Sequence, residues 1–209
     1  MMCIIFFLFS FIYNINCGAH SCEPPGQGPE TVKLQVFYEC LCPGCIHEYT
    51  TQLSPTIQKL HDYLDLETYP FGNGQMDDVS GTITFHCQHG PDECYGNALH
   101  ACAIDILKSP IDYVNFNSCL MNGGSTDNAA DECGKSRSVN PTPIKTCAKS
   151  DKAVQLLKVY AEETLKRHLK YMPYVLINGQ ECDYNKPLMA QVCSAFKNPP
   201  KECDEVLKL

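Results

Sequence analysis

The chain has 209 residues, of which 44% are hydrophobic and 19% charged, and it contains 15 cysteines and no tryptophan. This length fits one compact domain or one domain with an insertion, and the apolar content excludes long intrinsic disorder. The formal net charge of −8 excludes the basic footprint of a nucleic-acid-binding protein. The heavy use of cysteine indicates disulfides formed in an oxidising compartment, or metal sites.

The first residues have the features of a signal peptide. Residues 1–19 contain no charged side chain, and their apolar run from Cys3 to Ile12 is too short to span a bilayer. Small residues follow, so cleavage is expected after Cys17 or after Ala19. We therefore predict a signal peptide over 1–19, entry into the secretory pathway and no membrane span in the mature chain.

A CxxC motif stands near the start of the mature chain. A leader rich in Pro and Gly is expected over 20–31, and a strand with alternating apolar residues over 32–38. Cys42-Pro43-Gly44-Cys45 comes soon after that strand, and an amphipathic helix then extends to Leu60 with a kink expected at Pro55. A CxxC motif between a strand and a helix is typical of a thioredoxin-like redox unit.

The rest of the chain alternates between strand and helix patterns. Strands are expected over 64–69, 82–85 and 174–177, and helices over 93–108, 151–170 and 188–196. The segment 110–150 shows turns, glycines and cysteines with little periodicity. The order of these elements predicts an α/β thioredoxin-like domain over 32–200, a cysteine-rich helical insertion at about 90–170 and a C-terminal tail over 201–209.

The spacing of the CxxC motif suits thiol–disulfide exchange. Two intervening residues allow both sulfurs to meet across a single turn, and the unpaired N–H groups of a helix N-terminus stabilise a thiolate on the first cysteine. We therefore expect Cys42 to attack a substrate disulfide and Cys45, one turn deeper, to resolve the mixed disulfide. Pro43 suits the first helical position, where its missing N–H costs nothing.

A proline far along the chain gives a second indication. Pro173 stands immediately before the strand expected over 174–177. Thioredoxin-like folds hold a cis-proline against the active-site sulfurs at this place. We expect a cis Met172–Pro173 bond, which would turn the Met172 backbone towards the site where it can pair with substrate.

Metal binding is the competing interpretation of the cysteines. His47 beside the CxxC, and His86-Cys87 with His89, offer zinc ligand types. A structural zinc site usually has two paired CxxC knuckles, and this chain has one. Secretion also favours disulfides, so no metal site is expected. His47 is expected to be an exposed helix residue that can add positive charge near the thiolate.

The segment Cys87–Cys102 carries a specific motif. It matches CQHG-x2-EC-x2-N-x4-C at every fixed position. By this motif the chain resembles the gamma-interferon-inducible lysosomal thiol reductase (GILT) family, and the similarity extends from Val32 to Phe196. The resemblance implies a thioredoxin-like fold with a helical insertion, and reduction of protein disulfides at acidic pH in lysosomes or endosomes, or after secretion. It also implies no metal or organic cofactor, with a small thiol such as cysteine as electron donor.

The remaining cysteines are expected to form structural disulfides. Removing the signal peptide leaves an odd number. Cys40 could pair with a distant cysteine, intercept the active-site disulfide or remain unpaired, and the count favours the last of these. Cys87, Cys94 and Cys102 are expected to tie the strand ending near Cys87 to the helix beginning at Glu93. Cys182 with Cys193 is the best single guess for a pair. The ten structural candidates are Cys22, Cys87, Cys94, Cys102, Cys119, Cys133, Cys147, Cys182, Cys193 and Cys203.

Two other functions stay open at this point. A secreted disulfide oxidase or isomerase would use the same fold and differ only in redox poise. A secreted cysteine-rich binding module would use every disulfide structurally and have no reactive thiol. The sequence does not define the oligomeric state, the substrates, or the choice between lysosome and extracellular space.

Overall fold

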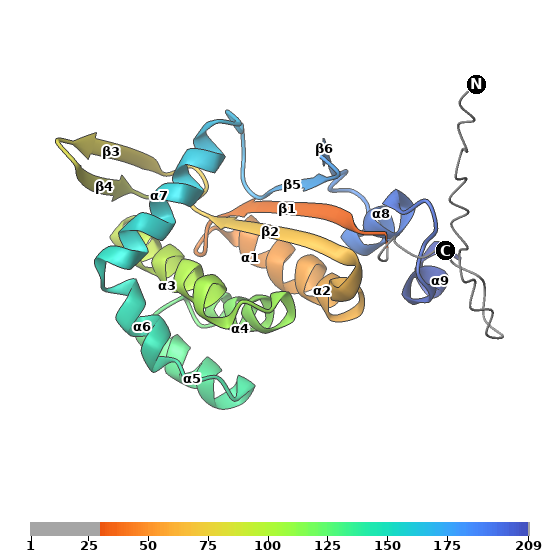
Figure 1. Cartoon of the computed structure of the whole chain (residues 1–209), viewed down its shortest axis with the longest axis horizontal. Coiled ribbons are helices and arrows are strands. Elements are labelled where there is room, and N and C mark those ends of the chain that lie inside the picture. Colours follow the sequence, from red (N-terminus) through yellow and green to blue (C-terminus); the bar gives the residue numbers. More distant parts are fainter. Residues whose placement is uncertain (1–29, 209) are drawn as a thin grey trace, which may run out of the picture.

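A four-stranded mixed sheet forms the centre of the computed structural model, which describes residues 30–208 (Figure 1). Its strands, in the order β2-β1-β5-β6, are β2 (Leu64–Pro70), β1 (Val32–Tyr38), β5 (Tyr174–Ile177) and β6 (Gln180–Glu181). β1 runs parallel to β2 and antiparallel to β5. The hairpin of β3 (Gln75–Val79) and β4 (Thr82–His86) projects from one end of this sheet (Figure 1).

β1 is central and buried on both faces. Alternate residues, including Val36 and Tyr38, pack into the main core beneath the sheet. Phe37 points to the opposite face, where its ring stacks on Tyr69 with centroids 4.4 Å apart. This double burial follows from the alternation of side chains along a strand, and it makes the end of β1 a fixed platform for the residues that follow.

The helix after the CxxC motif changes its pitch along its length. α1 (Pro43–His47) continues as a π-helical stretch (Glu48–Leu53) and then as α2 (Ser54–Leu60). The wider π turns lie just before Pro55, a residue that has no N–H to give to the preceding turn. Leu53 and Ile57 bury this helix against the sheet.

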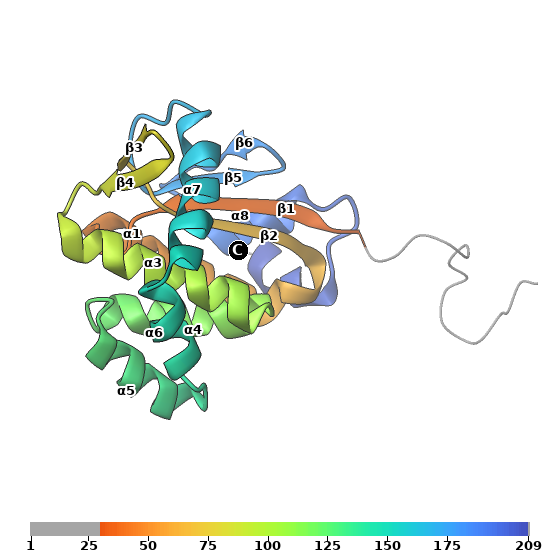
Figure 2. The same ribbon diagram turned by 60° about the vertical axis from the view of Figure 1, so that its left-hand side comes forward.

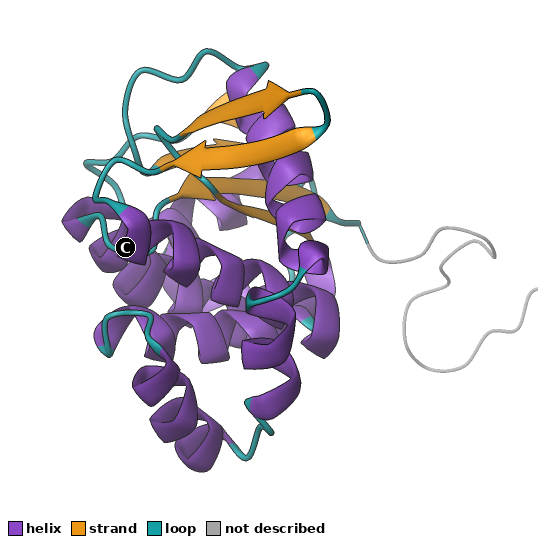
Figure 3. Cartoon of the chain, turned by 90° about the vertical axis from the view of Figure 1, so that its left-hand side faces the viewer, coloured by secondary structure: helices purple, strands orange, loops and turns teal. Residues whose placement is uncertain are grey.

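The insertion is more helical than the sequence pattern indicates. Five helices lie between β4 and β5: α3 (Pro91–Leu107), α4 (Pro110–Asn122), α5 (Asp127–Arg137), α6 (Thr142–Ala148) and α7 (Asp151–Leu165). The helical insertion expected at about 90–170 is therefore present, although the weak periodicity over 110–150 did not locate its separate helices. Small residues and cysteines dilute the apolar periodicity there, while packing between the helices supplies the stability. Helices α3 to α6 gather on one side of the sheet, as Figures 2 and 3 show.

A second core holds the insertion together. Phe116 and Leu120 of α4 and Ile144 of α6 are fully buried among small residues of α3. Disulfides join Cys102 to Cys147 and Cys119 to Cys133 within the same cluster. These cross-links between helices therefore supply part of the stability that longer apolar stripes on the helices would otherwise provide.

α7 ends five residues earlier than the helix expected over 151–170. It stops at Leu165, and His168 adopts a positive φ of 48°. The chain has to turn here to reach β5. The consequence is that residues 166–173 form a loop that returns towards the CxxC motif.

The C-terminal residues are tied to the domain. α8 (Leu188–Ala195) packs beneath the sheet, and α9 (Asp204–Leu207) follows it. Cys193 is bonded to Cys203, so the expected Cys182–Cys193 pair was wrong. Cys182 is a buried free thiol within the described residues. The expected signal peptide, most of the leader and Cys22 lie outside residues 30–208.

None of the helices in the described part of the chain combines the length and apolar character needed to cross a bilayer.

Candidate active site

The CxxC motif lies where β1 gives way to α1. Cys42 caps the helix, and the Cys45 N–H donates to the Cys42 sulfur over 3.4 Å. Both cysteines are free thiols, Cys42 partly exposed and Cys45 fully buried. The arrangement provides one accessible sulfur and one protected sulfur within a single turn.

The two thiols differ strongly in acidity. The hydrogen bond from Cys45, the backbone N–H groups of Cys45 and Gly44, and the charge of His89 lower the pKa of Cys42 to about 6, against the opposing effect of partial burial. The pKa of Cys45 is raised far above its ordinary range, first by its hydrogen bond to Cys42 and then by burial. Cys42 is therefore the group that ionises near neutral and acidic pH, as a nucleophilic thiol must.

The loop before β5 packs against the CxxC turn. The Met172–Pro173 peptide bond is cis, as the sequence predicts. A Cβ placed on Gly44 would lie 3.4 Å from Pro173 Cδ and 3.9 Å from the Met172 carbonyl oxygen. The Tyr184 hydroxyl fixes this loop from behind, donating to the Pro173 carbonyl over 3.0 Å. Met172 and Pro173 thus lie at the site.

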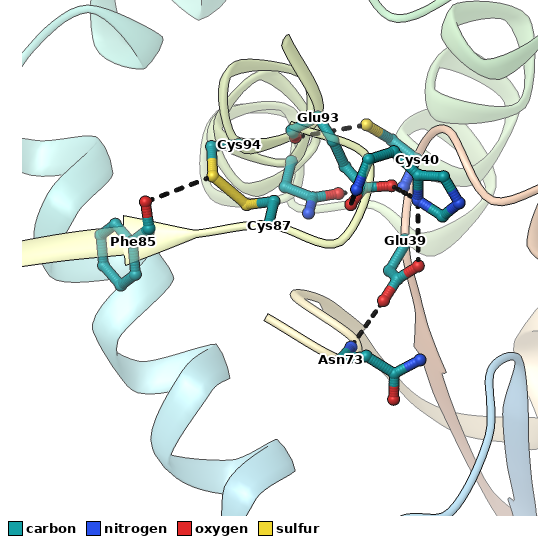
Figure 4. The surroundings of a disulfide bond; sticks show 9 residues. Glu39, Cys40, Asn73, Phe85, Cys87, Glu93 and Cys94 are labelled. Atoms are coloured by element: carbon teal, nitrogen blue, oxygen red, sulfur yellow. Dashed lines mark hydrogen bonds and ion pairs between the residues drawn. A yellow bond between two sulfur atoms is a disulfide. The ribbon is translucent and has the colours of Figure 1, made fainter. Parts of the chain in front are cut away.

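The CQHG motif forms a loop beside the CxxC turn. Cys87 is bonded to Cys94, which ties the end of β4 to the first turns of α3 (Figure 4). Cys102 takes no part in this link, contrary to expectation, because it lies deeper along α3 and faces Cys147 in the second core. The short disulfide loop therefore holds the intervening Gln88 and His89 in place.

Each polar residue of the motif satisfies a group near the site. Asn97 is fully buried and its side-chain oxygen accepts the Cys40 N–H over 3.0 Å. Gln88 accepts a hydrogen bond of 2.7 Å from the side chain of Asn73. His89 Nδ1 lies 2.6 Å from Glu93 Oε2. The motif thus connects α3, the loop after β2 and the end of β1 around the CxxC turn.

Glu39 is a site residue that sequence reasoning missed. It follows β1 directly, is fully buried, and accepts the Asn73 N–H over 2.6 Å (Figure 4). Gly72, at a φ of +63°, allows this approach, because a Cβ there would lie 2.1 Å from Glu39 Cγ. Burial raises the pKa of Glu39 to about 7, although the Asn73 hydrogen bond opposes the change. The available signal was an acidic residue directly after an apolar strand and three residues before Cys42.

Cys40 is a free, fully buried thiol, as expected of the cysteine interpreted as unpaired, and Cys182 is a second buried free thiol outside the CxxC motif among the described residues. Its sulfur lies 3.5 Å from the Glu93 carbonyl oxygen, and burial raises its pKa well above the ordinary range. It faces α3 and is not ionised under conditions where Cys42 is. Cys40 is therefore a packing residue rather than a third reactive thiol.

The histidines considered above as zinc ligands do not lie in the ligand sets that the sequence suggested. Cys87 is in a disulfide, so the His86-Cys87-His89 set lacks its thiolate. His47 is exposed on α1 and lies near Thr51. Glu39, His89 and Glu93 are a group whose ligand-type atoms lie within 4.8 Å of one another.

Comparisons with known proteins agree with this geometry. The family model described as "Gamma interferon inducible lysosomal thiol reductase (GILT)" matches residues 33–137. A relative named "Gamma-interferon-inducible lysosomal thiol reductase" from Carassius auratus is 34% identical, over 92% of this chain and 80% of its own length. A "Gamma-interferon-responsive lysosomal thiol protein" from Arabidopsis thaliana is 34% identical, over 83% of this chain and 76% of its own.

The fold has a counterpart among solved structures. A "thioredoxin-like oxidoreductase from Silicibacter pomeroyi DSS-3" covers 86% of this chain and 88% of its own, with a TM-score of 0.53 and 12% sequence identity. At that identity the likeness concerns the fold alone. Together, the matched family model, the relatives and the fold identify the chain as a member of the gamma-interferon-inducible lysosomal thiol reductase family with a thioredoxin-like α/β fold.

Proposed function

We propose that this protein reduces disulfide bonds in other proteins by thiol–disulfide exchange, with Cys42 as the nucleophile and Cys45 as the resolving thiol. The observation that carries the proposal is the pair of free cysteines at the start of α1. One is accessible with a lowered pKa, and the other is buried behind it with a raised pKa. That asymmetry suits a two-step exchange in which the two sulfurs act in turn.

The proposed reaction transfers two electrons to the substrate. The Cys42 thiolate attacks one sulfur of a substrate disulfide, and the other substrate sulfur leaves as a thiolate that takes up a proton. Cys45 then loses its proton and attacks Cys42, which releases the second substrate thiol and leaves a Cys42–Cys45 disulfide. Two molecules of a small thiol such as cysteine would return the two electrons to the Cys42–Cys45 disulfide and leave as their own disulfide, and the scheme requires no metal or organic cofactor.

The lowered pKa of Cys42 supports activity at acidic pH. An unperturbed thiol with a pKa of about 8.5 is ionised to roughly one part in 3,000 at pH 5. With a pKa of about 6, roughly a tenth of Cys42 is ionised at that pH. We therefore propose that the protein acts in lysosomes or endosomes, or outside the cell after secretion.

The position of the loop at Pro173 supports the proposal that the substrate is a protein. It places the Met172 carbonyl oxygen next to the CxxC turn, where a backbone group can pair with an extended substrate segment. We propose that Met172 and Pro173 align disulfide-containing polypeptides so that one sulfur faces Cys42.

An insulin-type reduction assay tests the proposal directly. The purified mature protein, given a small thiol, should reduce a denatured disulfide-containing protein at about pH 5. Cys42→Ser should abolish turnover, because no nucleophile is left, and Cys45→Ser should accumulate a mixed disulfide that mass spectrometry detects. Retained turnover in Cys42→Ser would overturn the assignment.

The same preparation separates the two alternative functions. A reductase requires a Cys42–Cys45 potential more reducing than that of its substrates, whereas an oxidase requires the opposite, so the measured potential decides between them. A binding module would show no alkylation of Cys42 after mild reduction. Both measurements use the full mature chain.

A further inference from the structure

Two buried carboxyl groups and one histidine converge beside the CxxC turn. Glu39 comes from the end of β1 and Glu93 from the first turn of α3 (Figure 4). His89 lies in the loop before α3. His89 Nδ1 lies 2.6 Å from Glu93 Oε2 and 3.4 Å from Glu39 Oε2. Both glutamates are fully buried, whereas the imidazole is partly open to solvent.

The carboxyl groups need a cation at the position of His89. Burying a charged carboxylate is costly unless it is paired and hydrogen-bonded. Glu93 meets this need through His89, whose backbone N–H also donates to Glu93 Oε1 over 3.0 Å. Glu39 Oε2 is buried without a hydrogen-bond partner and has only the 3.4 Å approach of His89. The geometry therefore favours a protonated imidazole between the two acids.

We propose that His89 is a positioning residue for the thiol chemistry: its imidazolium, fixed between Glu93 and Glu39, adds positive charge that favours the Cys42 thiolate in acid, beyond the hydrogen bonds of the CxxC turn itself. This inference rests on the function proposed above. The histidine of the CQHG motif then acts on the Cys42 thiol through its charge. The two glutamates keep that histidine protonated and in place.

The charge of this cluster changes with pH in the direction that the proposal requires. Burial alone would lower the pKa of His89, but its hydrogen bond to Glu93 and the charges of Glu93, Glu39 and Cys42 raise it. Glu39, with a pKa of about 7, is uncharged in acid, where the hydrogen bond to Glu93 is the main interaction that keeps His89 protonated. Below neutral pH the cation is present and Glu39 adds no opposing charge. Above neutral pH Glu39 becomes an anion and works against the thiolate.

Few other titratable groups face Glu39 from the elements packed around it. Cys42 and Cys45 face it from α1, and the loop after β2 contributes only the backbone of Asn73 and the space at Gly72. Cys40, directly after Glu39, points to α3 and stays protonated. Further out, His168 and Lys170 line shallow surface hollows around Asn73.

His47 provides a matched comparison. It lies on α1, two residues after Cys45, and is the histidine that the sequence places nearest to the thiols. In the folded chain it is exposed and its charge acts on Glu48. His89 is 44 positions beyond Cys45 in sequence, yet its charge, unlike that of His47, is among the effects that lower the pKa of Cys42, after the hydrogen bonds from Cys45 and Gly44.

The test measures alkylation of Cys42 against pH in the reduced mature protein, with a chelator present and the labelled peptide identified by mass spectrometry. In His89→Gln the midpoint should move to higher pH, and the alkylation rate at pH 5 should fall by about threefold or more. His47→Gln should follow the wild-type profile. An unchanged profile in His89→Gln, or an equal change in His47→Gln, would overturn the proposal.

A reciprocal measurement covers the case in which His89→Gln does not fold. If the thiolate and the imidazolium stabilise each other, removing the thiolate by Cys42→Ser must lower the titration midpoint of His89, followed by NMR of its ring protons. An unchanged His89 midpoint contradicts the proposal. If wild-type Cys42 is not alkylated in acid, the proposed function itself fails. If it is alkylated normally but neither variant shows a change, only the role of His89 fails.

Discussion

The end of β1 and the helical insertion use the same residue type for opposite purposes. Cys45 in α1, shortly after the end of β1, and Cys102 in α3 are both completely buried. Cys102 is closed in a disulfide with Cys147, whose Cα lies 5.9 Å away across two helices. Cys45 is a free thiol next to another free thiol. Burial therefore does not decide whether a cysteine of this chain is structural or reactive.

The surroundings of the two regions explain the difference. The insertion core consists of Leu, Ile, Phe and Ala side chains around its disulfides, so nothing there stabilises a thiolate. The site has backbone N–H groups at the α1 N-terminus and the charge of His89 beside Cys42. A cysteine becomes reactive where donors and a cation converge on its sulfur. The comparison leads to three predictions about stability.

The largest effect is expected from opening the insertion. Replacing Cys102 and Cys147 together by Ala removes a cross-link between residues 45 positions apart, which costs about 4 kcal/mol in the chain-entropy model. Replacing Cys42 and Cys45 together by Ser should cost far less in the reduced protein, where they are not bonded. Urea unfolding under mildly reducing conditions that leave structural disulfides intact measures both. Equal losses would contradict the division between structural and reactive cysteines.

The second prediction concerns the buried acid at the site. The pKa of Glu39 is raised from 4.5 to about 7, so the folded protein binds its proton more tightly than the unfolded chain does. The contribution of Glu39 to stability must then fall as the pH rises from about 4.5 to about 7. Glu39→Gln should be close to wild type at pH 5 and more stable by about 3 kcal/mol at pH 8.

The contribution of His100 to stability changes with pH in the opposite direction to that of Glu39, so His100 has to be present in both proteins that are compared. Burial lowers its pKa to about 3, so its contribution to stability rises with pH between about 3 and 6.5. Because His100 is present in both proteins, its effect cancels when the free energy of unfolding of Glu39→Gln is compared with that of wild type. A difference between the two proteins that does not depend on pH would show that Glu39 is ionised in the folded state throughout.

The smallest of the three effects is expected at the contact between α3 and the end of β1. A Cβ on Gly96 would lie 2.4 Å from Cys40 Sγ and 2.9 Å from Ser125 Cβ. Gly96→Ala should therefore destabilise the protein by about 1–3 kcal/mol through overpacking. Adding Cys40→Ala should recover part of the loss, because the nearer of the two atoms is removed. If Gly96→Ala left the free energy of unfolding unchanged, α3 and the end of β1 would be less tightly packed than these distances indicate.

Much of the architecture follows from local patterns in the sequence. The alternating residues of β1 and the apolar, β-branched run of β5 are strong signals, and both strands lie where they were predicted. The cis bond at Pro173 was expected from the CxxC context and is present. A helical insertion was expected here, but the bounds of the separate helices over 110–150 were not located, because their stability comes from one another and from two disulfides rather than from apolar stripes. Cysteine pairing likewise depends on which helices meet.

What the sequence by itself determined is the chemistry of the central motif: two cysteines one turn apart after a buried strand, and a CQHG motif that assigns the chain to its family. Only the tertiary structure decided that Cys193 bonds to Cys203, that Cys182 has no disulfide partner within residues 30–208, and that Glu39 meets His89. The physical reason is the range of the interactions. Strand and helix signals act within a few residues, whereas pairing and charge depend on segments that only folding brings together.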